Sequence, residues 1–174
     1  DNTLDRQFDV PKPNTAWVSD ITYIKTYEGF LYLAVVIDLY SRRVIGWSLS
    51  THLRADLVNE ALRQALRSRP RDQELIFHSD RGSQYGSRSF RALLREANIT
   101  QSMSRRANPY DNAWTESFMG TLKTEMVKES QLTDERNTRK AIFSYIDGYY
   151  NTVRKHSALG YLSPSKFESK YYQN

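Results

Sequence analysis

The chain has 174 residues, of which 39% are hydrophobic and 13% aromatic, a composition that suffices for one domain with its own core. It carries 25 Lys and Arg against 20 Asp and Glu, and the net charge of +5 suits a polyanionic partner better than a neutral metabolite. Cysteine is absent, which excludes disulfide scaffolds, cysteine-based zinc sites and thiol nucleophiles. No apolar run approaches ~18 residues and no signal-peptide pattern opens the chain, so we expect a soluble domain of a reducing compartment.

The first 50 residues predict an antiparallel sheet. Residues 1–14 are polar, with two prolines, and are expected to form an arm or linker that enters the domain. Runs rich in Val, Ile, Tyr, Leu and Trp follow at 17–25, 30–39 and 43–50, and their short connections predict a three-stranded meander. The middle run is apolar on both faces apart from Asp38, as expected of a central strand.

From residue 54 onward, helical and extended patterns alternate. The expected elements are a helix at 54–67, a strand at 75–78, a helix at 87–97, a strand at 99–103, long helices at 111–128 and 134–150, and a short last helix after Pro164. This order predicts an α/β fold: a mixed five-stranded sheet, its three antiparallel strands first, flanked by helices. Ribonuclease H-like folds have this order, but so do other mixed sheets. We expect a core at 15–151 and a basic C-terminal tail at 152–174.

Three carboxylates stand out among the 20 acidic residues. Asp20 lies in the middle of an extended apolar run, where aspartate is disfavoured and an unpaired buried charge is costly. Asp80 ends the apolar strand LIFHSD, and Glu116 lies on the long helix that follows the loop at 104–109. Each could instead be structural: Asp20 could pair with a lysine or arginine, Asp80 could cap the next helix, and Glu116 could lie in solvent. Together, carboxylates from two strands and a helix could converge on a hard divalent cation that relieves their mutual repulsion.

Five sequence blocks carry a resemblance to a known family. They are, in order, WVSDITYI, FLYLAVVIDLYSRRVIGWSLS, HSDRGSQY, NPYDNAWTESFMGTLKTE and HSALGYLSPSKF. Their order is similar to that in bacterial transposases of the insertion-sequence-three family, whose catalytic core resembles that of retroviral integrases. The 35 residues between Asp80 and Glu116 match the spacing of this Asp–Asp–Glu class. The resemblance implies a ribonuclease H-like fold, with Asp20, Asp80 and Glu116 as catalytic and metal-binding residues.

The resemblance also implies a reaction. It is the metal-dependent cleavage and strand transfer of mobile-element DNA ends, with two Mg²⁺ ions, for which Mn²⁺ would substitute, held by the three carboxylates. The implied partners are element ends, target DNA and further copies of the chain, in the bacterial cytoplasm at the nucleoid and without a membrane. Helix-turn-helix regions are expected before residue 1. The alternatives are a ribonuclease H-like nuclease that does not join DNA and a non-catalytic DNA-binding module.

The candidate DNA contacts are basic, amide and aromatic residues near the triad, in the loop before Glu116 and in the C-terminal tail. They are Arg81, Gln84, Tyr85, Arg105, Arg106, Asn108, Tyr110, Asn112, Lys123, Arg154, Lys155 and His156. Lys123 follows Glu116 by almost two helical turns and therefore returns to the same face. By contrast, we expect Arg88, Arg91 and Arg95 to form the solvated face of an amphipathic helix.

Three further residues are given structural roles. If the first hairpin turns at 26–29, Asp38 pairs near Trp17, about three residues or ~10 Å along the strand from Asp20. His78 is expected to be a hydrogen-bonded core histidine, and Asp111 is expected to cap the helix that carries Glu116.

Overall fold

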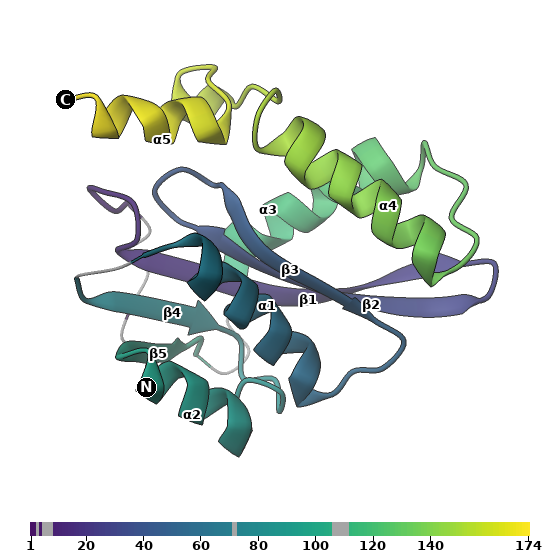
Figure 1. Cartoon of the computed structure of the whole chain (residues 1–174), viewed down its shortest axis with the longest axis horizontal. Helices are drawn as coiled ribbons and strands as arrows, with labels where there is room; N and C mark the ends of the chain where they lie inside the picture. Colours follow the sequence, from purple (N-terminus) through teal and green to yellow (C-terminus); the bar gives the residue numbers. More distant parts are fainter. Residues whose placement is uncertain (3, 5–8, 71–72, 106–111) are drawn as a thin grey trace.

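A five-stranded mixed sheet forms the centre of the computed structural model, which describes all residues except 3, 5–8, 71–72 and 106–111. The strands are β1 (Ala16–Thr26), β2 (Gly29–Asp38), β3 (Val44–Ser50), β4 (Leu75–Ser79) and β5 (Ile99–Met103). Their spatial order is β3-β2-β1-β4-β5 (Figure 1). The first three strands are antiparallel, while β4 runs parallel to β1 and β5 runs parallel to β4. The predicted meander and mixed sheet are therefore confirmed.

Helices and single helical turns connect and follow the strands. They are α1 (Ala55–Ser68), α2 (Arg88–Glu96), α3 (Ala113–Leu122), η2 (Lys123–Val127), α4 (Glu135–Tyr145), η3 (Ile146–Tyr150), η4 (Ser157–Leu159) and α5 (Pro164–Tyr172). Both long helices that the sequence predicts are present, and each ends in a wider π-helical turn, η2 after α3 and η3 after α4. Side chains cap several helices: Ser87 caps α2, Asp134 caps α4 and Ser163 caps α5.

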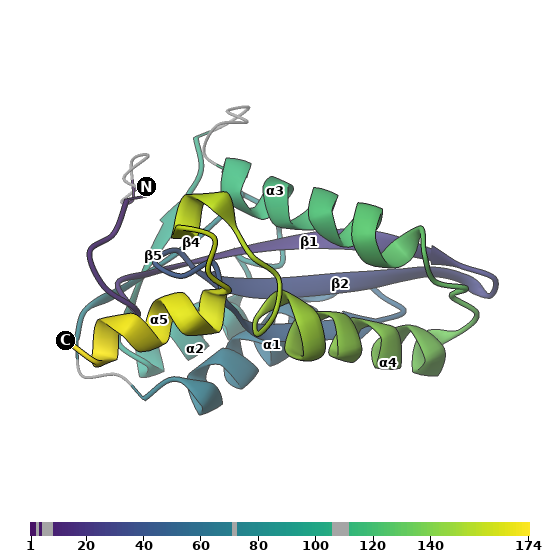
Figure 2. The ribbon, with the colours of Figure 1, turned by 90° about the horizontal axis from the view of Figure 1, so that it is seen from above.

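The helices cover the two faces of the sheet in separate layers (Figure 2). On one face, Val18, Leu33 and Val35 pack with residues of α3 and α4 such as Phe118 and Ile142. On the other face, the alternate strand residues pack against α1 and α2, as the second core cluster shows for Trp17, Ala34, Val36, Leu62 and Phe90. Because β2 is covered on both sides, its sequence is almost continuously apolar.

A buried ion network attaches the C-terminal helix to this core. The Arg69 guanidinium donates to Asp38 Oδ2 at 3.2 Å and to both carboxylate oxygens of Glu168 on α5 at 2.6 Å. Asp38, Arg69 and Glu168 are 0%, 7% and 5% exposed. Asp38 pairs with Trp17 in the sheet register, as expected, and its structural role is confirmed.

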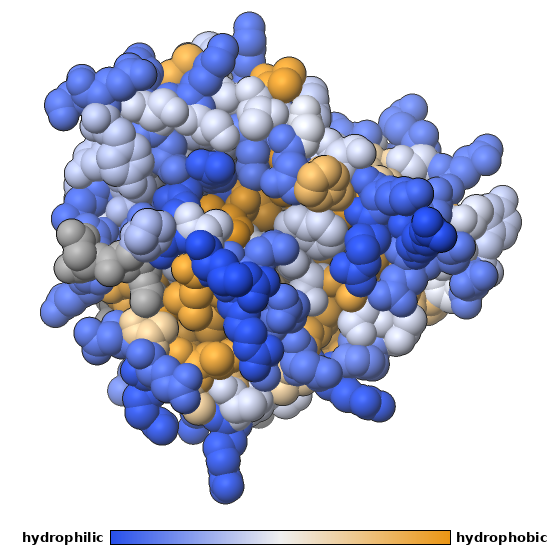
Figure 3. Space-filling model, viewed as in Figure 1, coloured by the Kyte–Doolittle hydropathy of each residue, from blue (hydrophilic) through white to orange (hydrophobic). Residues whose placement is uncertain are grey.

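Polar side chains dominate the surface of the face in Figure 1, and apolar side chains are visible mainly in the hollows between them (Figure 3). Within the described ranges, none of the helices combines the length and apolar character that a membrane span requires.

Candidate active site

Asp20 lies in the middle of β1, on the face of the sheet that α3 covers. It is paired with Val35 of the central strand, so its backbone is fixed by the sheet. The Ile21 amide donates to Asp20 Oδ1 at 2.8 Å. Burial is the main cause that raises the pKa of Asp20 to about 6; the negative charges of Asp80 and Glu116 contribute to the rise, while the Ile21 amide and the Thr115 hydroxyl oppose it. No Lys or Arg among the described residues forms an ion pair with Asp20, so the structural alternative for this residue fails there.

Asp80 follows the last residue of β4 and lies beside Asp20. Val18 and His78 are partners in the parallel β1–β4 ladder, and each aspartate comes two residues after its partner. Because side chains alternate along a strand, both aspartates point to the same face. Asp80 does not cap α2, whose cap is Ser87. Instead, Asp80 Oδ1 accepts a hydrogen bond from the Gly82 amide at 2.7 Å.

Gly82 is the residue that allows this turn. A Cβ atom at Gly82 would lie 2.9 Å from Asp80 Oδ1 and 3.0 Å from Gln84 Oε1. Such contacts are too short, so any other residue would displace the Asp80 carboxylate from its present position. The glycine of the HSDRGSQY block thus holds a carboxylate in place.

Glu116 lies in the first turn of α3, with its side chain exposed. The neighbouring Thr115 is buried, and its hydroxyl donates to the Asn112 carbonyl at 2.9 Å, which orders the start of the helix. The helix begins above β1, where its first residues pack beside Val18 and Ser19. Glu116 is near enough to Asp20 for its charge to raise the pKa of Asp20.

The charges of Asp80 and Glu116 therefore both act on Asp20, but the three carboxylates do not form a closed ligand set. Among the described residues, no group of three or more His, Asp or Glu side chains is arranged to enclose a metal ion. The donor chemistry nevertheless fits a hard divalent cation: three carboxylates from three elements repel one another, and one is partly buried without a cation. The convergence of the three carboxylates on a metal ion therefore stays a prediction.

The loop that leads to α3 is anchored on β4. The Ser104 amide donates to the Ser79 carbonyl at 2.8 Å, and the Ser104 hydroxyl lies 2.8 Å from Asn112 Oδ1. Arg81 Nε donates to the Ser104 carbonyl at 2.8 Å. Arg105 is exposed. The expected contacts Arg106, Asn108 and Tyr110, and the expected cap Asp111, lie outside the described residues.

Two expected DNA contacts remain accessible near the triad. Lys123 is exposed at the end of α3, and its ammonium lies 5.0 Å from the ring centroid of Tyr23 on β1. Gln84 is partly exposed, and its amide donates to the Leu53 carbonyl at 3.1 Å. Lys123 thus lies beside β1, the strand that carries Asp20, and Gln84 lies in the segment that follows Asp80. As expected, Arg88, Arg91 and Arg95 are exposed on α2, which packs on the opposite face of the sheet from α3.

Tyr85 corrects one sequence expectation. Its side chain is 1% exposed, packs against Phe77 and Phe90, and shares a 2.8 Å hydrogen bond with the Ser19 hydroxyl. It supports the strand residue before Asp20 and is not available as a direct DNA contact. His78 is also a core residue, as expected: it is 2% exposed, and its Nδ1 lies 2.9 Å from the Ser102 hydroxyl.

The expected basic patch at 154–156 is also corrected. Arg154 Nε donates to both oxygens of Glu125 at 2.7 Å, which neutralises much of its charge. His156 is 7% exposed, and burial together with the charges of Arg154 and Arg42 lowers its pKa to about 4, so it is neutral at pH 7. Lys155 is exposed, so its ammonium group is accessible to DNA, as the sequence predicted.

Comparison with known sequences identifies the family. Residues 10–109 match the integrase core domain family, and residues 97–164 match a second integrase core domain family. The chain is 44% identical over 167 residues to the transposase for insertion sequence element IS904 of Lactococcus lactis, covering 96% of this chain and 66% of that protein. It is 46% identical over 170 residues to transposase InsF for insertion sequence IS3A of Escherichia coli, covering 98% of this chain and 59% of the relative. The chain therefore spans less than two thirds of each relative.

Solved structures share the fold at low sequence identity. A chain of the simian T-cell lymphotropic virus intasome matches 92% of this chain with a TM-score of 0.76 at 20% identity, over 56% of its own length. The catalytic core domain of HTLV-2 integrase, solved with magnesium, matches 90% of this chain with a TM-score of 0.69 at 19% identity, over 97% of its length. The fold is thus ribonuclease H-like, as the resemblance implied. The chain belongs to the integrase core domain family, as a catalytic core of the kind found in transposases of the insertion-sequence-three family.

Proposed function

We propose that this chain cleaves the ends of a mobile DNA element and joins them to target DNA, with Asp20, Asp80 and Glu116 as its catalytic residues. The observation that carries the proposal is the placement of the two aspartates on one face of β1 and β4, beside the helix turn that bears Glu116. We also propose that its substrates are element ends and target DNA and that several copies act together in the active complex. The proposed location is the bacterial cytoplasm, at the nucleoid.

The three carboxylates are the groups that would hold the metal. When bound, two Mg²⁺ ions, or Mn²⁺ in their place, supply the Lewis acidity for in-line displacement at a phosphodiester. The protein's own contribution is to keep oxygen ligands at fixed places: Asp20 on a central strand, Asp80 in a turn closed by Gly82, and Glu116 on a helix that packs on the core. No protein nucleophile is required, which agrees with a chain that contains no cysteine.

The remaining accessible candidates describe a path for the DNA backbone. Lys123 follows α3, the helix that bears Glu116, Arg81, Arg105 and Asn112 lie at the anchored loop, and Gln84 lies in the segment after Asp80. Basic and amide side chains of this kind fix the register of the strand through its phosphates. We include Arg106, Asn108 and Tyr110 in this loop contact by sequence, and Lys155 as a separate contact to flanking DNA.

The proposal is tested with pre-nicked oligonucleotides that carry an element end. Asp20→Asn, Asp80→Asn and Glu116→Gln each keep the side-chain volume but remove an anionic ligand, so each should reduce cleavage and joining to background while DNA binding persists. Wild-type protein that hydrolyses the strand but never joins it would instead identify a ribonuclease H-like nuclease. Loss of folding in all three variants would show that the carboxylates are structural.

A further inference from the structure

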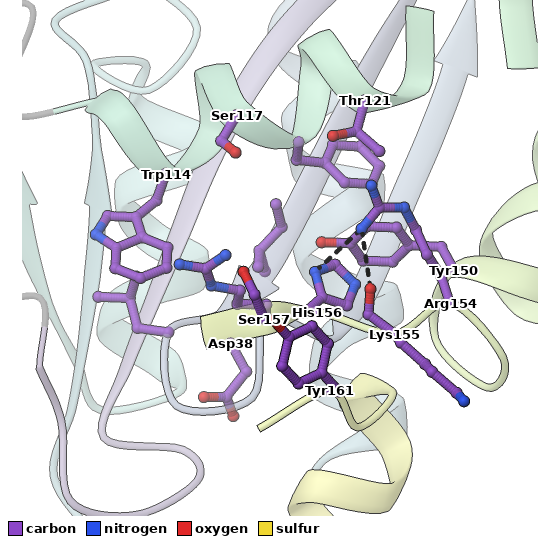
Figure 4. A pocket seen from close by; sticks show the side chains of 14 residues that line it. Asp38, Trp114, Ser117, Thr121, Tyr150, Arg154, Lys155, His156, Ser157 and Tyr161 are labelled. Carbon is purple, nitrogen blue, oxygen red and sulfur yellow. Dashed lines mark hydrogen bonds between the residues drawn. The ribbon is translucent and has the colours of Figure 1, made fainter. Parts of the chain in front are cut away.

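A cavity of about 360 Å³ lies beside α3, and none of the three triad residues lines it. Trp114, Ser117 and Thr121 line it from α3, while Arg154, His156 and Tyr161 line it from the segment between η3 and α5 (Figure 4). This segment contains the first part of the HSALGYLSPSKF block, residues 156–163, for which the proposed reaction gives no role. Because Ser117 follows Glu116 directly, one turn of α3 connects the cavity and the triad.

Arg42 gives the cavity an unneutralised positive charge. Its guanidinium stacks on the indole of Trp114, with 4.0 Å between the guanidinium carbon and the ring centroid. The side chain is partly buried, and this burial lowers the pKa of Arg42 from its ordinary value. No carboxylate among the described residues forms an ion pair with it. A partly desolvated guanidinium in this state is suited to an anionic ligand from outside the chain.

His156 adds a donor that lacks an acceptor. Its Nδ1 lies 3.4 Å from Arg154 Nη1, and since a guanidinium only donates, Nδ1 must accept this hydrogen bond. The neutral ring then carries its proton on Nε2, which is buried and has no hydrogen-bond partner within the described part of the chain. Buried donors without acceptors are rare and call for an explanation, such as a ligand or water that supplies the acceptor. His156 packs at right angles against Tyr150, which fixes the orientation of its ring.

The size and lining of the cavity define the ligand. A volume of about 360 Å³ is at the lower end of the range for small-molecule pockets and is too small to admit a duplex. The lining combines the Arg42 guanidinium and hydroxyl groups with several aromatic side chains, among them Trp114 and Tyr161, of which Tyr161 is 69% exposed. Cations that take a phosphate beside rings that stack on a base are the usual elements of single-strand recognition.

We propose that this cavity binds one unpaired nucleotide of the DNA strand that α3 contacts. Arg42 holds its phosphate, and its base lies against Trp114 and Tyr161. The proposal rests on the proposed function for the source of the strand. It adds a second DNA-binding site on α3, the helix that bears Glu116. A DNA strand that leaves the triad would be held by one of its nucleotides bound in this cavity.

The test measures binding without catalysis. A 5′-phosphorylated deoxytrinucleotide is titrated into the chain in EDTA, and binding is followed by tryptophan fluorescence and by equilibrium dialysis. Removing the stacking ring in Trp114→Leu should weaken binding by about 5- to 150-fold, the range for loss of one base–aromatic stack. Arg42→Gln should weaken binding by at least about tenfold, the usual scale for one charge-assisted hydrogen bond. Arg95→Gln, the same charge change on the exposed face of α2, should leave binding unchanged.

Controls distinguish loss of the binding site from misfolding, and a DNA strand from other anionic ligands. Arg42 has a left-handed backbone with φ of 61°, so Arg42→Asn, which tolerates that conformation, serves as a second variant, with thermal melting as the folding check. Equal or tighter binding of a free nucleotide would indicate a nucleotide site unrelated to DNA. Full competition by a hexaglutamate peptide would indicate an acidic protein partner. Either result, or unchanged binding in both Arg42 variants, overturns the proposal. The proposed function is judged separately, because triad variants affect joining and not this metal-free binding.

Discussion

Asp20 and Asp80 lie side by side on one face of the sheet, because Val18 and His78, each two residues earlier, are partners in the parallel β1–β4 ladder. This register is what turns two aspartates 60 positions apart in the chain into one site. This arrangement lowers the stability of the fold when no metal ion is bound, because the Asp20 carboxylate is partly buried and is repelled by two further carboxylates.

The raised pKa of Asp20 predicts how the stability of the fold depends on pH. The pKa of Asp20 is raised from 3.8 to about 6, so between these values the folded chain binds more protons than the unfolded chain. Stability therefore falls as pH rises through this window, by roughly 3 kcal/mol for this group alone. Asp38 shifts in the same direction, so the measurement is the difference between wild type and Asp20→Asn in urea unfolding. Asp20→Asn should be the more stable protein at pH 8, without metal, and should lose this advantage at pH 4. Equal stability at both values would contradict the electrostatic account of the site.

Gly82→Ala should separate activity from folding. The added Cβ would meet the Asp80 carboxylate at 2.9 Å, and the flexible side chain would move away from its position at low cost in stability. We expect less than about 1 kcal/mol of destabilisation but a loss of joining activity of about 10- to 100-fold. Gly86→Ala is the matched control, since its Cβ would meet other atoms no closer than 3.7 Å. Full activity in Gly82→Ala would show that the position of Asp80 is not critical.

Glu168→Gln should destabilise the protein through the buried ion network. It would remove the charge that receives both 2.6 Å hydrogen bonds from Arg69 and leave that guanidinium buried, with Asp38 as its one anionic partner among the described residues. The expected loss in free energy of unfolding is about 3–5 kcal/mol, the usual result of breaking a buried pair. Glu60→Gln, which breaks the exposed pair with Arg67, should cost less than about 1 kcal/mol. Similar losses in the two variants would show that the network does not hold α5 in place.

Lys123→Ala tests the DNA path. If Lys123 contacts one phosphate, its removal should weaken binding to all duplex sequences alike, and the slope of log affinity against log salt should fall in magnitude by about 0.9. Arg95→Ala removes the same charge from the exposed face of α2 and should leave the slope unchanged. A smaller slope for Arg95→Ala and not for Lys123→Ala would place the DNA on the α2 side of the molecule.

The sequence predicted the strands and the helices, because these depend on local periodicity. The triad came from the family resemblance, and its role as the metal-binding set stays a prediction. The sequence did not predict the Arg69–Glu168 pair, whose members are 99 residues apart, because nothing local distinguishes Glu168 from a solvated helix residue. The burial of Tyr85 and His156 was missed for a related reason. Both residue types are common at nucleic-acid interfaces and in cores, and only the packing of other elements against them decides which role they take.

The most direct test of the central claim is anomalous scattering from a crystal of this chain soaked in Mn²⁺. The account predicts Mn²⁺ density between the carboxylates of Asp20 and Asp80, with Glu116 turned toward it, and loss of that density in Asp80→Asn. Saturating Mn²⁺ that leaves this position empty, or that binds elsewhere while the three carboxylates stay apart, would contradict it.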